Sequence, residues 1–149
     1  MSTITYESDI VAWANEQATL LRTKQFALLD IEHLAEEIAD VGKSEQRELA
    51  SRMAVLQCHL LKWLYQPARQ GTSWQLTIKT QRERIKRRLK QTPSLKYCLS
   101  DSDWLADAWD DARDLTEKET AIPYDKFPES CPWTIDEVLS NDWLPSMKA

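Results

Sequence analysis

One helical stretch decides the fold: residues 30–65, with the sequence DIEHLAEEIADVGKSEQRELASRMAVLQCHLLKWLY. At 100° per residue, its apolar side chains fall within about 60° of one direction, which is the pattern of an amphipathic helix. The residues of this apolar stripe are Ile31, Leu34, Ile38, Val41, Leu49, Met53, Leu56, Leu60 and Trp63. Because the stripe keeps its phase across Gly42, we predict one continuous helix with Asp30 as its N-cap and Pro67 just beyond its end.

The length of this helix restricts how it can be packed. It would run about 54 Å at about 1.5 Å per residue. A sphere containing a chain of this size is only about 38 Å across. We therefore expect the helix to project from the bundle, to lengthen it, or to pair with a second copy, with its apolar side turned inward or toward a companion.

Apolar residues at spacings of three and four predict helices on either side of this stretch. Ser8 is placed to cap a first helix that ends near residues 23–25. Its expected core residues are Ile10, Trp13, Ala14, Leu20 and Leu21. A third helix follows Gly71, with Thr72 or Ser73 as its cap, and ends near Pro93.

The C-terminal part of the sequence predicts one more main helix and a tail. Residues 94–120 are helical in pattern, as one helix or as two pieces broken at 100–102. Residues 123–149 contain prolines and several large aromatic side chains, so we expect a tail that packs onto the bundle, with Thr134 capping a short helix. The predicted fold is an all-α antiparallel bundle of about four main helices, in a single domain of residues 1–149.

The composition favours a soluble intracellular protein. The chain has 149 residues, a formal net charge of −5 and three cysteines without metal-like or redox-like spacing. It contains no run of eighteen apolar residues and no signal-peptide pattern near its amino terminus. We expect reduced thiols in the cytoplasm and no membrane segment, and the negative charge disfavours nucleic acid as a partner.

Two neighbouring segments carry opposite charge. Residues 79–90 contain seven basic residues and one acidic residue, a net charge of +6. Residues 101–119 contain eight acidic and two basic residues, a net charge of −6. Because consecutive helices in a bundle are usually antiparallel neighbours, we predict that these two helices pair with each other. The alternative is a phosphate-binding face on residues 79–90.

Polar residues interrupt the apolar stripe at a regular interval. Glu45, Arg52 and His59 are seven residues apart, so they lie above one another on the helix, with Glu48 beside them. Charges on a buried face need partners, and a polar layer of this kind sets register or partner choice in helical assemblies. The functional alternative is a carboxylate and imidazole site, but no Glu stands three residues before His33 or His59, as di-iron bundles require. We therefore predict neither a metal site nor a cofactor.

A resemblance to a known family rests on motifs spread over the chain. They are Leu34-Ala35-Glu36-Glu37-Ile38, Gly42-Lys43-Ser44-Glu45, Arg47-Glu48-Leu49, Arg52, His59-Leu60-Leu61-Lys62-Trp63, Gln66-Pro67, Ser73-Trp74, Gln81-Arg82 and Pro93-Ser94-Leu95. With these, the chain resembles the Domain of Unknown Function 29 family of bacterial, largely cyanobacterial, proteins from Tyr6 to Pro145. The resemblance implies an all-helical bacterial cytoplasmic protein and brings no activity or catalytic residue with it.

Three functional hypotheses follow, and catalytic residues stay unknown because the sequence has no phosphate-binding loop or nucleophile elbow. The first is a non-enzymatic module that self-associates or binds a protein partner, using Glu45, Glu48, Arg52 and His59. A secondary group of candidates is Lys62, Trp63, Gln66 and Trp74. The alternative is an enzyme or metal-binding carboxylate and histidine bundle. The third hypothesis is a nucleic-acid-associated regulator that uses the basic helix 79–90.

Overall fold

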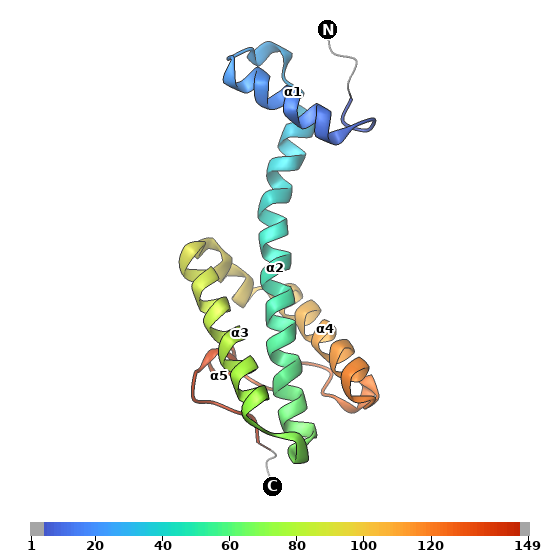
Figure 1. Ribbon diagram of the computed structural model, residues 1–149, viewed down its shortest axis with the longest axis vertical. Helices are drawn as coiled ribbons and strands as arrows, with labels where there is room; N and C mark the ends of the chain where they lie inside the picture. The colour runs from blue at the N-terminus through green and yellow to red at the C-terminus, as the bar shows by residue number, and fades with distance from the viewer. Residues whose placement is uncertain (1–4, 147–149) are drawn as a thin grey trace. The chain divides into compact units, whose positions relative to one another are not determined.

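The computed structural model describes residues 5–146, which form helices and no strand. The main helices are α1 (Ile10–Arg22), α2 (Ile31–Tyr65), α3 (Thr72–Gln91) and α4 (Ser102–Thr120), and the tail holds a short α5 (Ile135–Leu139) (Figure 1). The short 3₁₀ helices are η1 (Phe26–Leu28), η2 (Pro67–Arg69), η3 (Pro93–Ser100) and η4 (Tyr124–Lys126). The predicted all-α class is confirmed.

The long helix is continuous, as predicted. α2 runs through Gly42 without a break, and a Cβ added at Gly42 would meet nothing within 4 Å. The backbone N–H of His33 donates to Oδ1 of Asp30 at 3.4 Å, so Asp30 caps the helix as expected. Gln66 and Pro67 follow its last residue because the residue before a proline leaves helical geometry.

The chain divides into two compact units, residues 1–44 and 45–149, which we call the N-terminal and C-terminal units. The N-terminal unit contains α1, η1 and the first part of α2. The C-terminal unit contains the rest of α2 and all later elements. That the chain is a single domain stays a prediction from its length.

The core of the C-terminal unit is built on the second half of α2. Leu49, Met53, Leu56 and Leu60 are fully buried, as the apolar stripe predicts. They pack with Ile78, Ile85 and Leu89 of α3, Leu95 and Cys98 of η3, and Ala108 of α4. Trp133, Trp143 and Leu144 of the tail pack against the same cluster.

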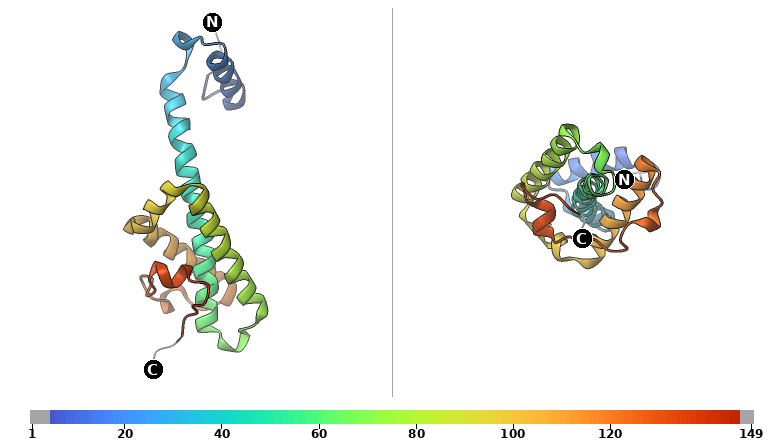
Figure 2. Two further views of the ribbon diagram at one scale, coloured as in Figure 1. Left: turned by 90° about the vertical axis from the view of Figure 1, so that its left-hand side faces the viewer. Right: turned by 90° about the horizontal axis from the view of Figure 1, so that it is seen from below.

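The prediction that the basic and acidic helices pair with each other is wrong. Within the C-terminal unit, α2 lies between α3 and α4 in Figure 1 and in the right-hand view of Figure 2. Between residues 5 and 146, ion pairs link Arg88 of α3 to Glu45 of α2, and Lys62 of α2 to Glu119 of α4, but none links α3 to α4. The eight-residue η3 separates α3 from α4 in the chain, and each of these two helices packs on its own side of α2.

Two buried arginines fasten the tail to the bundle. Arg82 of α3 is 2% exposed, and its guanidinium donates to the carbonyl oxygens of Val138 at 2.8 Å and Trp143 at 2.7 Å. Arg113 of α4 donates to the carbonyl oxygen of Tyr124 at 3.4 Å and lies 3.8 Å from the centre of its ring. Carbonyls of the tail thus receive charged donors from the bundle.

Several local expectations need correction. Asp9, not Ser8, caps α1, because its side chain accepts from the N–H of Ala12 whereas Ser8 bonds within a turn to Thr5. The N-cap of α3 is Gly71, without a side-chain bond. Residues 93–100 form a 3₁₀ helix and α4 begins at Ser102. The helical segment 94–120 is therefore interrupted near residues 100–102. The capping box of Thr134 is present as predicted.

Candidate interaction site

The N-terminal unit exposes most of its large apolar side chains. Of the ten large hydrophobic residues recorded as exposed in the described chain, eight lie between residues 10 and 41. They are Ile10, Val11, Leu21, Phe26, Leu28, Ile31, Ile38 and Val41. The expected burial of Ile10, Ala14 and Leu21 in α1 is therefore wrong, and only Trp13 of the expected set is buried.

This unit has almost no core of its own. Among residues 5–44, only Trp13 and Gln17 are buried. Chains of about 40 residues usually need disulfides, metals or association to stay folded. An apolar face that nothing in its own unit covers is the kind of surface by which proteins bind one another.

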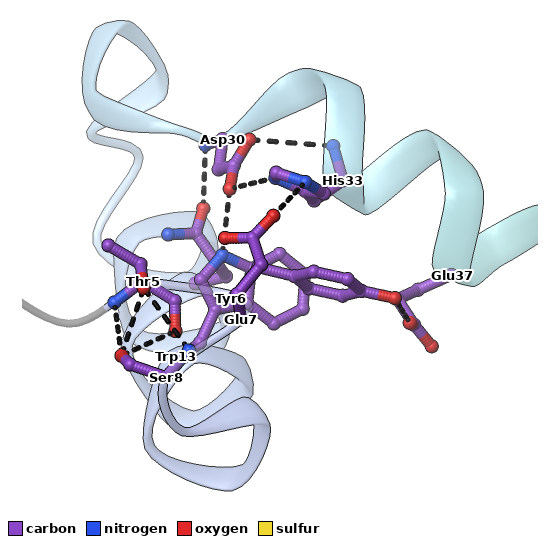
Figure 3. Close-up of polar contacts among 9 residues, drawn as sticks. Thr5, Tyr6, Glu7, Ser8, Trp13, Asp30, His33 and Glu37 are labelled. Atoms are coloured by element: carbon purple, nitrogen blue, oxygen red, sulfur yellow. Dashed lines mark hydrogen bonds and ion pairs between the residues drawn. The ribbon is translucent and has the colours of Figure 1, made fainter.

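A compact polar cluster joins α1 to the start of α2 (Figure 3). Trp13 donates its indole N–H to Oδ2 of Asp30 at 2.9 Å, and Nδ1 of His33 donates to the same oxygen at 2.8 Å. Tyr6 stacks on the His33 ring at 4.3 Å between ring centres and donates its hydroxyl to Glu37. This cluster links Trp13 of α1, and Tyr6 before it, to the first turns of α2.

The cluster shifts the pKa values of its members. Desolvation opposes ionisation of Asp30, but hydrogen bonds from His33 and Trp13 prevail and hold the pKa of this carboxyl below its usual range. The hydrogen bond to Asp30 raises the pKa of His33, and the charge of Glu7, whose Oε1 lies 3.2 Å from Nε2, acts in the same direction. The hydrogen bond to Glu37 raises the pKa of Tyr6 to about 12.

The polar cluster and the exposed apolar residues occupy different faces of α2. At 100° per residue, Asp30, His33 and Glu37 lie together, about 90° round the helix from the line through Ile31, Ile38 and Val41. The exposed fractions of the three apolar residues are 69%, 71% and 66%. Thus Tyr6 and Trp13 contact one face of this part of α2, and the apolar residues Ile31, Ile38 and Val41 stay exposed.

The structure brings together three of the four polar residues singled out from the sequence. Arg88 of α3 lies 2.6 Å from Oε2 of Glu45 and 3.7 Å from Oε1 of Glu48. Arg52 lies 3.1 Å from the same oxygen of Glu48. These side chains are half-buried or exposed and form a network between α2 and α3, with Arg88 as the member that sequence analysis did not include.

His59 does not join that network. Its Nδ1 donates to the carbonyl oxygen of Val55 in its own helix at 3.0 Å. Burial lowers its pKa, and the nearby charge of Lys62 lowers it as well. The regular spacing of seven therefore aligns His59 with Glu45 and Arg52 along the helix but gives it a separate environment.

The secondary candidates surround the end of α2. Nζ of Lys62 lies 2.9 Å from Oε2 of Glu119 and 5.2 Å from the centre of the Trp74 ring. The backbone N–H of Gln66 donates to Lys62, and the carbonyl of Trp63 accepts from Gln70, so these two residues serve local structure.

Cys58 also contacts the Glu119 carboxylate, with its sulfur 3.3 Å from Oε2. Burial raises the pKa of Cys58 to about 11, so its thiol stays protonated and unreactive at neutral pH.

Metal and membrane sites are not found in the part of the chain that the structure describes. Residues 5–146 contain no group of three or more His, Cys, Asp or Glu side chains arranged to hold a metal ion. Within the same residues, no helix is both long enough and apolar enough to cross a membrane.

Comparison with known proteins identifies the family. The model of the family described as "Domain of unknown function DUF29" matches residues 5–144. The chain belongs to this family. The predicted resemblance is confirmed, and the DUF29 match begins at the first described residue and includes both units. No curated protein and no solved structure gives a match.

Sequence reasoning missed the polar cluster of this DUF29 protein, although part of its signal was present. Asp30 and His33 are three residues apart at the start of a helix, which places their side chains in contact. Their partners Tyr6 and Trp13 come from a different element, and only the fold shows that they meet there.

Proposed function

We propose that this DUF29 protein is a self-association module in which the exposed apolar stripe at the start of α2 packs against the same stripe of a second copy. The observation that carries the proposal is the exposure of Ile31, Ile38 and Val41 in a unit of which residues 5–44 include only two buried ones. The apolar face lacks a cover within its own unit, and burying it lowers the free energy of the assembly.

The spacing of the stripe supports a two-stranded parallel coiled coil as the mode of association. Ile31 and Ile38 occupy equivalent a positions of a heptad, and Leu34 and Val41 occupy the d positions. In parallel coiled coils, β-branched residues at a with leucine at d favour two strands, a rule that Ile31, Leu34 and Ile38 fit and that Val41 does not. Two heptads are short for an isolated coiled coil, so the exposed apolar residues of α1 and η1 are expected to contribute to the same interface.

The residues beside the stripe also favour the parallel arrangement. Ala35 and Gly42 occupy e positions, and Asp30 and Glu37 occupy g positions. In a parallel pair each g residue faces an e residue, so the acidic side chains meet Ala or Gly. In an antiparallel pair with Ile31 opposite Val41, the g residues would face each other and bring Glu37 of one copy against Glu37 of the other, which is repulsive.

Light scattering after size-exclusion chromatography tests this function. The wild-type protein is expected to have twice the 17.3 kDa mass of one chain. The triple variant Ile31→Ser, Ile38→Ser, Val41→Ser should have the mass of one chain with its helical circular dichroism retained, because all three residues are exposed. A double variant of Leu76→Ser and Tyr97→Ser, which are exposed in the C-terminal unit, is the control and should keep the double mass.

Two results would count against self-association. One is a single-chain mass for the wild type at every micromolar concentration, and the other is an unchanged mass for the triple variant.

A nucleic-acid regulator is the second candidate, because no ion pair within residues 5–146 connects the basic face of α3 to α4. Arg84 and Arg87 are exposed and have no polar partner in the described chain, and together with Arg52, Arg88 and Gln91 they line a depression of about 180 Å³. Binding to DNA that weakens steeply with salt, and that an Arg84→Ala, Arg87→Ala variant loses, would support this candidate. Absence of binding at low ionic strength would exclude it.

We propose that this protein self-associates in the bacterial cytoplasm, a location favoured by the family resemblance and by its cysteines. Cys58, Cys98 and Cys131 are all free thiols, two of them buried. Mass spectrometry after alkylation of unfolded protein from a bacterial cytoplasm should find all three modified, whereas a disulfide between any two would contradict this location.

A further inference from the structure

An apolar cavity of about 280 Å³ lies in the C-terminal unit, between α2, α4 and the segment that leads into α5. Its walls are mainly apolar or aromatic, and no cationic side chain takes part. The lining residues at its centre are Gln57, Leu105, Trp109, Cys131, Trp133 and Ile135. Ala106, Ser102 and Ser130 also line it and are exposed, so the cavity communicates with the solvent.

Gln57 gives this cavity an unused acceptor. Its side chain is 1% exposed, and its Nε2 donates only to the sulfur of Cys131 at 3.9 Å. Its Oε1 is buried and accepts no hydrogen bond. The Cys131 thiol donates to the carbonyl oxygen of Trp133 at 3.5 Å, which leaves it unable to donate to Gln57. A buried acceptor without a donor is costly and rare in a folded protein.

The aromatic walls define the shape of a suitable ligand. Trp109 and Trp133 meet edge to face, with ring centres 5.5 Å apart and an angle of 89° between planes. The indole N–H of Trp109 is already bound to the carbonyl oxygen of Pro128 at 2.8 Å, so this ring offers the cavity its apolar surface. Aromatic walls of this kind favour a third planar ring.

We propose that this cavity binds a small planar aromatic molecule with one hydrogen-bond donor, which it gives to Oε1 of Gln57. The apolar walls supply most of the affinity and the single acceptor supplies selectivity. The exposed carboxylate of Glu129 and the absence of a cation among the lining residues disfavour anionic ligands. This site lies wholly within residues 45–149 and does not depend on the self-association proposed above.

The test compares two probes of nearly equal shape, indole and indene, of which only indole carries an N–H donor. Titration calorimetry on the full chain should show that indole binds. Indene should bind at least about tenfold more weakly, because it leaves Gln57 without a donor. Nuclear magnetic resonance should show indole-induced shifts at the side chains of Trp109 and Trp133.

Two variants separate the parts of the proposal. Gln57→Leu should bind both probes with similar affinity, since the acceptor is gone. Ala106→Leu fills the exposed rim of the cavity and should abolish binding of both probes without unfolding the protein. Ala39→Leu, the same substitution at an exposed helical position of the N-terminal unit, is the control and should bind like the wild type.

Three results would overturn the proposal: no binding of indole at millimolar concentration, equal binding of indole and indene to the wild type, or undiminished binding to the Ala106→Leu variant.

Discussion

The two histidines have opposite environments, and their protonation should reveal it. The hydrogen bond to Asp30 raises the pKa of His33, whereas burial lowers the pKa of His59. In a titration followed by nuclear magnetic resonance, His33 should therefore titrate above the usual value of about 6.5 and His59 below it. Asp30→Asn should bring the pKa of His33 down toward 6.5 and leave His59 unchanged, and a His33 pKa below that of His59 would contradict the polar cluster.

These shifts predict opposite pH effects on stability. The contribution of His33 to the free energy of unfolding is complete below its pKa in the unfolded chain, about 6.5. It is lost as the pH rises through the higher pKa that His33 has in the folded protein. The contribution of His59 is present above about 6.5 and is lost as the pH falls through its lower folded value. Mildly alkaline conditions should therefore loosen the contact between α1 and α2 while leaving the core of the C-terminal unit intact.

Arg82 is predicted to be structural although it belongs to a basic run. Arg82→Ala removes the donors to the carbonyls of Val138 and Trp143 and should lower the free energy of unfolding by about 3 kcal/mol. Arg84→Ala is the control, because Arg84 is exposed and has no partner in the described chain, and it should change stability by less than about 0.5 kcal/mol. Urea unfolding of both variants measures the difference, and equal effects would contradict the role of Arg82 in holding the tail.

At the scale of the helices, the continuity of α2 predicts the effect of its glycine. Gly42 lies in the middle of the helix with open space around it, so Gly42→Ala should stabilise the protein by about 1 kcal/mol. Gly71 is the N-cap of α3, a position that disfavours alanine, so Gly71→Ala should be neutral or destabilising. Thermal unfolding followed by circular dichroism distinguishes the two, and a loss of stability in Gly42→Ala would indicate that the helix needs to bend there.

The sequence was sufficient to predict the helices but not what covers them. A period of 3.6 residues shows which side of a helix is apolar. Ile31 and Leu49 lie on the same apolar side of α2. In the structure Leu49 is fully buried, because α3, η3 and α4 pack around the second half of α2, whereas Ile31 is 69% exposed. The difference depends on where other elements lie, which local periodicity does not contain.

The sequence of the basic helix α3 contains a pattern that indicates the burial of Arg82. Arg82 is aligned with Ile78, Ile85 and Leu89 at spacings of four, three and seven, so it lies on the buried stripe of α3. A charge in such a position needs internal acceptors. That these acceptors are carbonyls of the tail could not be predicted, since the tail has no regular pattern from which its path follows.

At the scale of the whole molecule, charge predicts how association depends on salt. Residues 5–44 contain eight acidic and three basic residues, a net charge of −5, so two N-terminal units repel each other. Raising the salt from about 0.05 M to about 0.5 M shortens the screening length and should tighten the dimer. Sedimentation equilibrium at the two salt concentrations measures this effect. Weaker association in high salt would instead indicate that opposite charges hold the copies together.

The most direct test of the proposed self-association is a disulfide cross-link between two copies at Ile38. In a parallel coiled coil the two a positions face each other, so Ile38→Cys should form a disulfide-linked dimer under mild oxidation, visible on a non-reducing gel. Ala39→Cys, one residue along and directed away from the stripe, should remain largely a single chain, as should the wild type with its own three cysteines. Cross-linking of Ile38→Cys that is no faster than that of Ala39→Cys would contradict the proposed dimer.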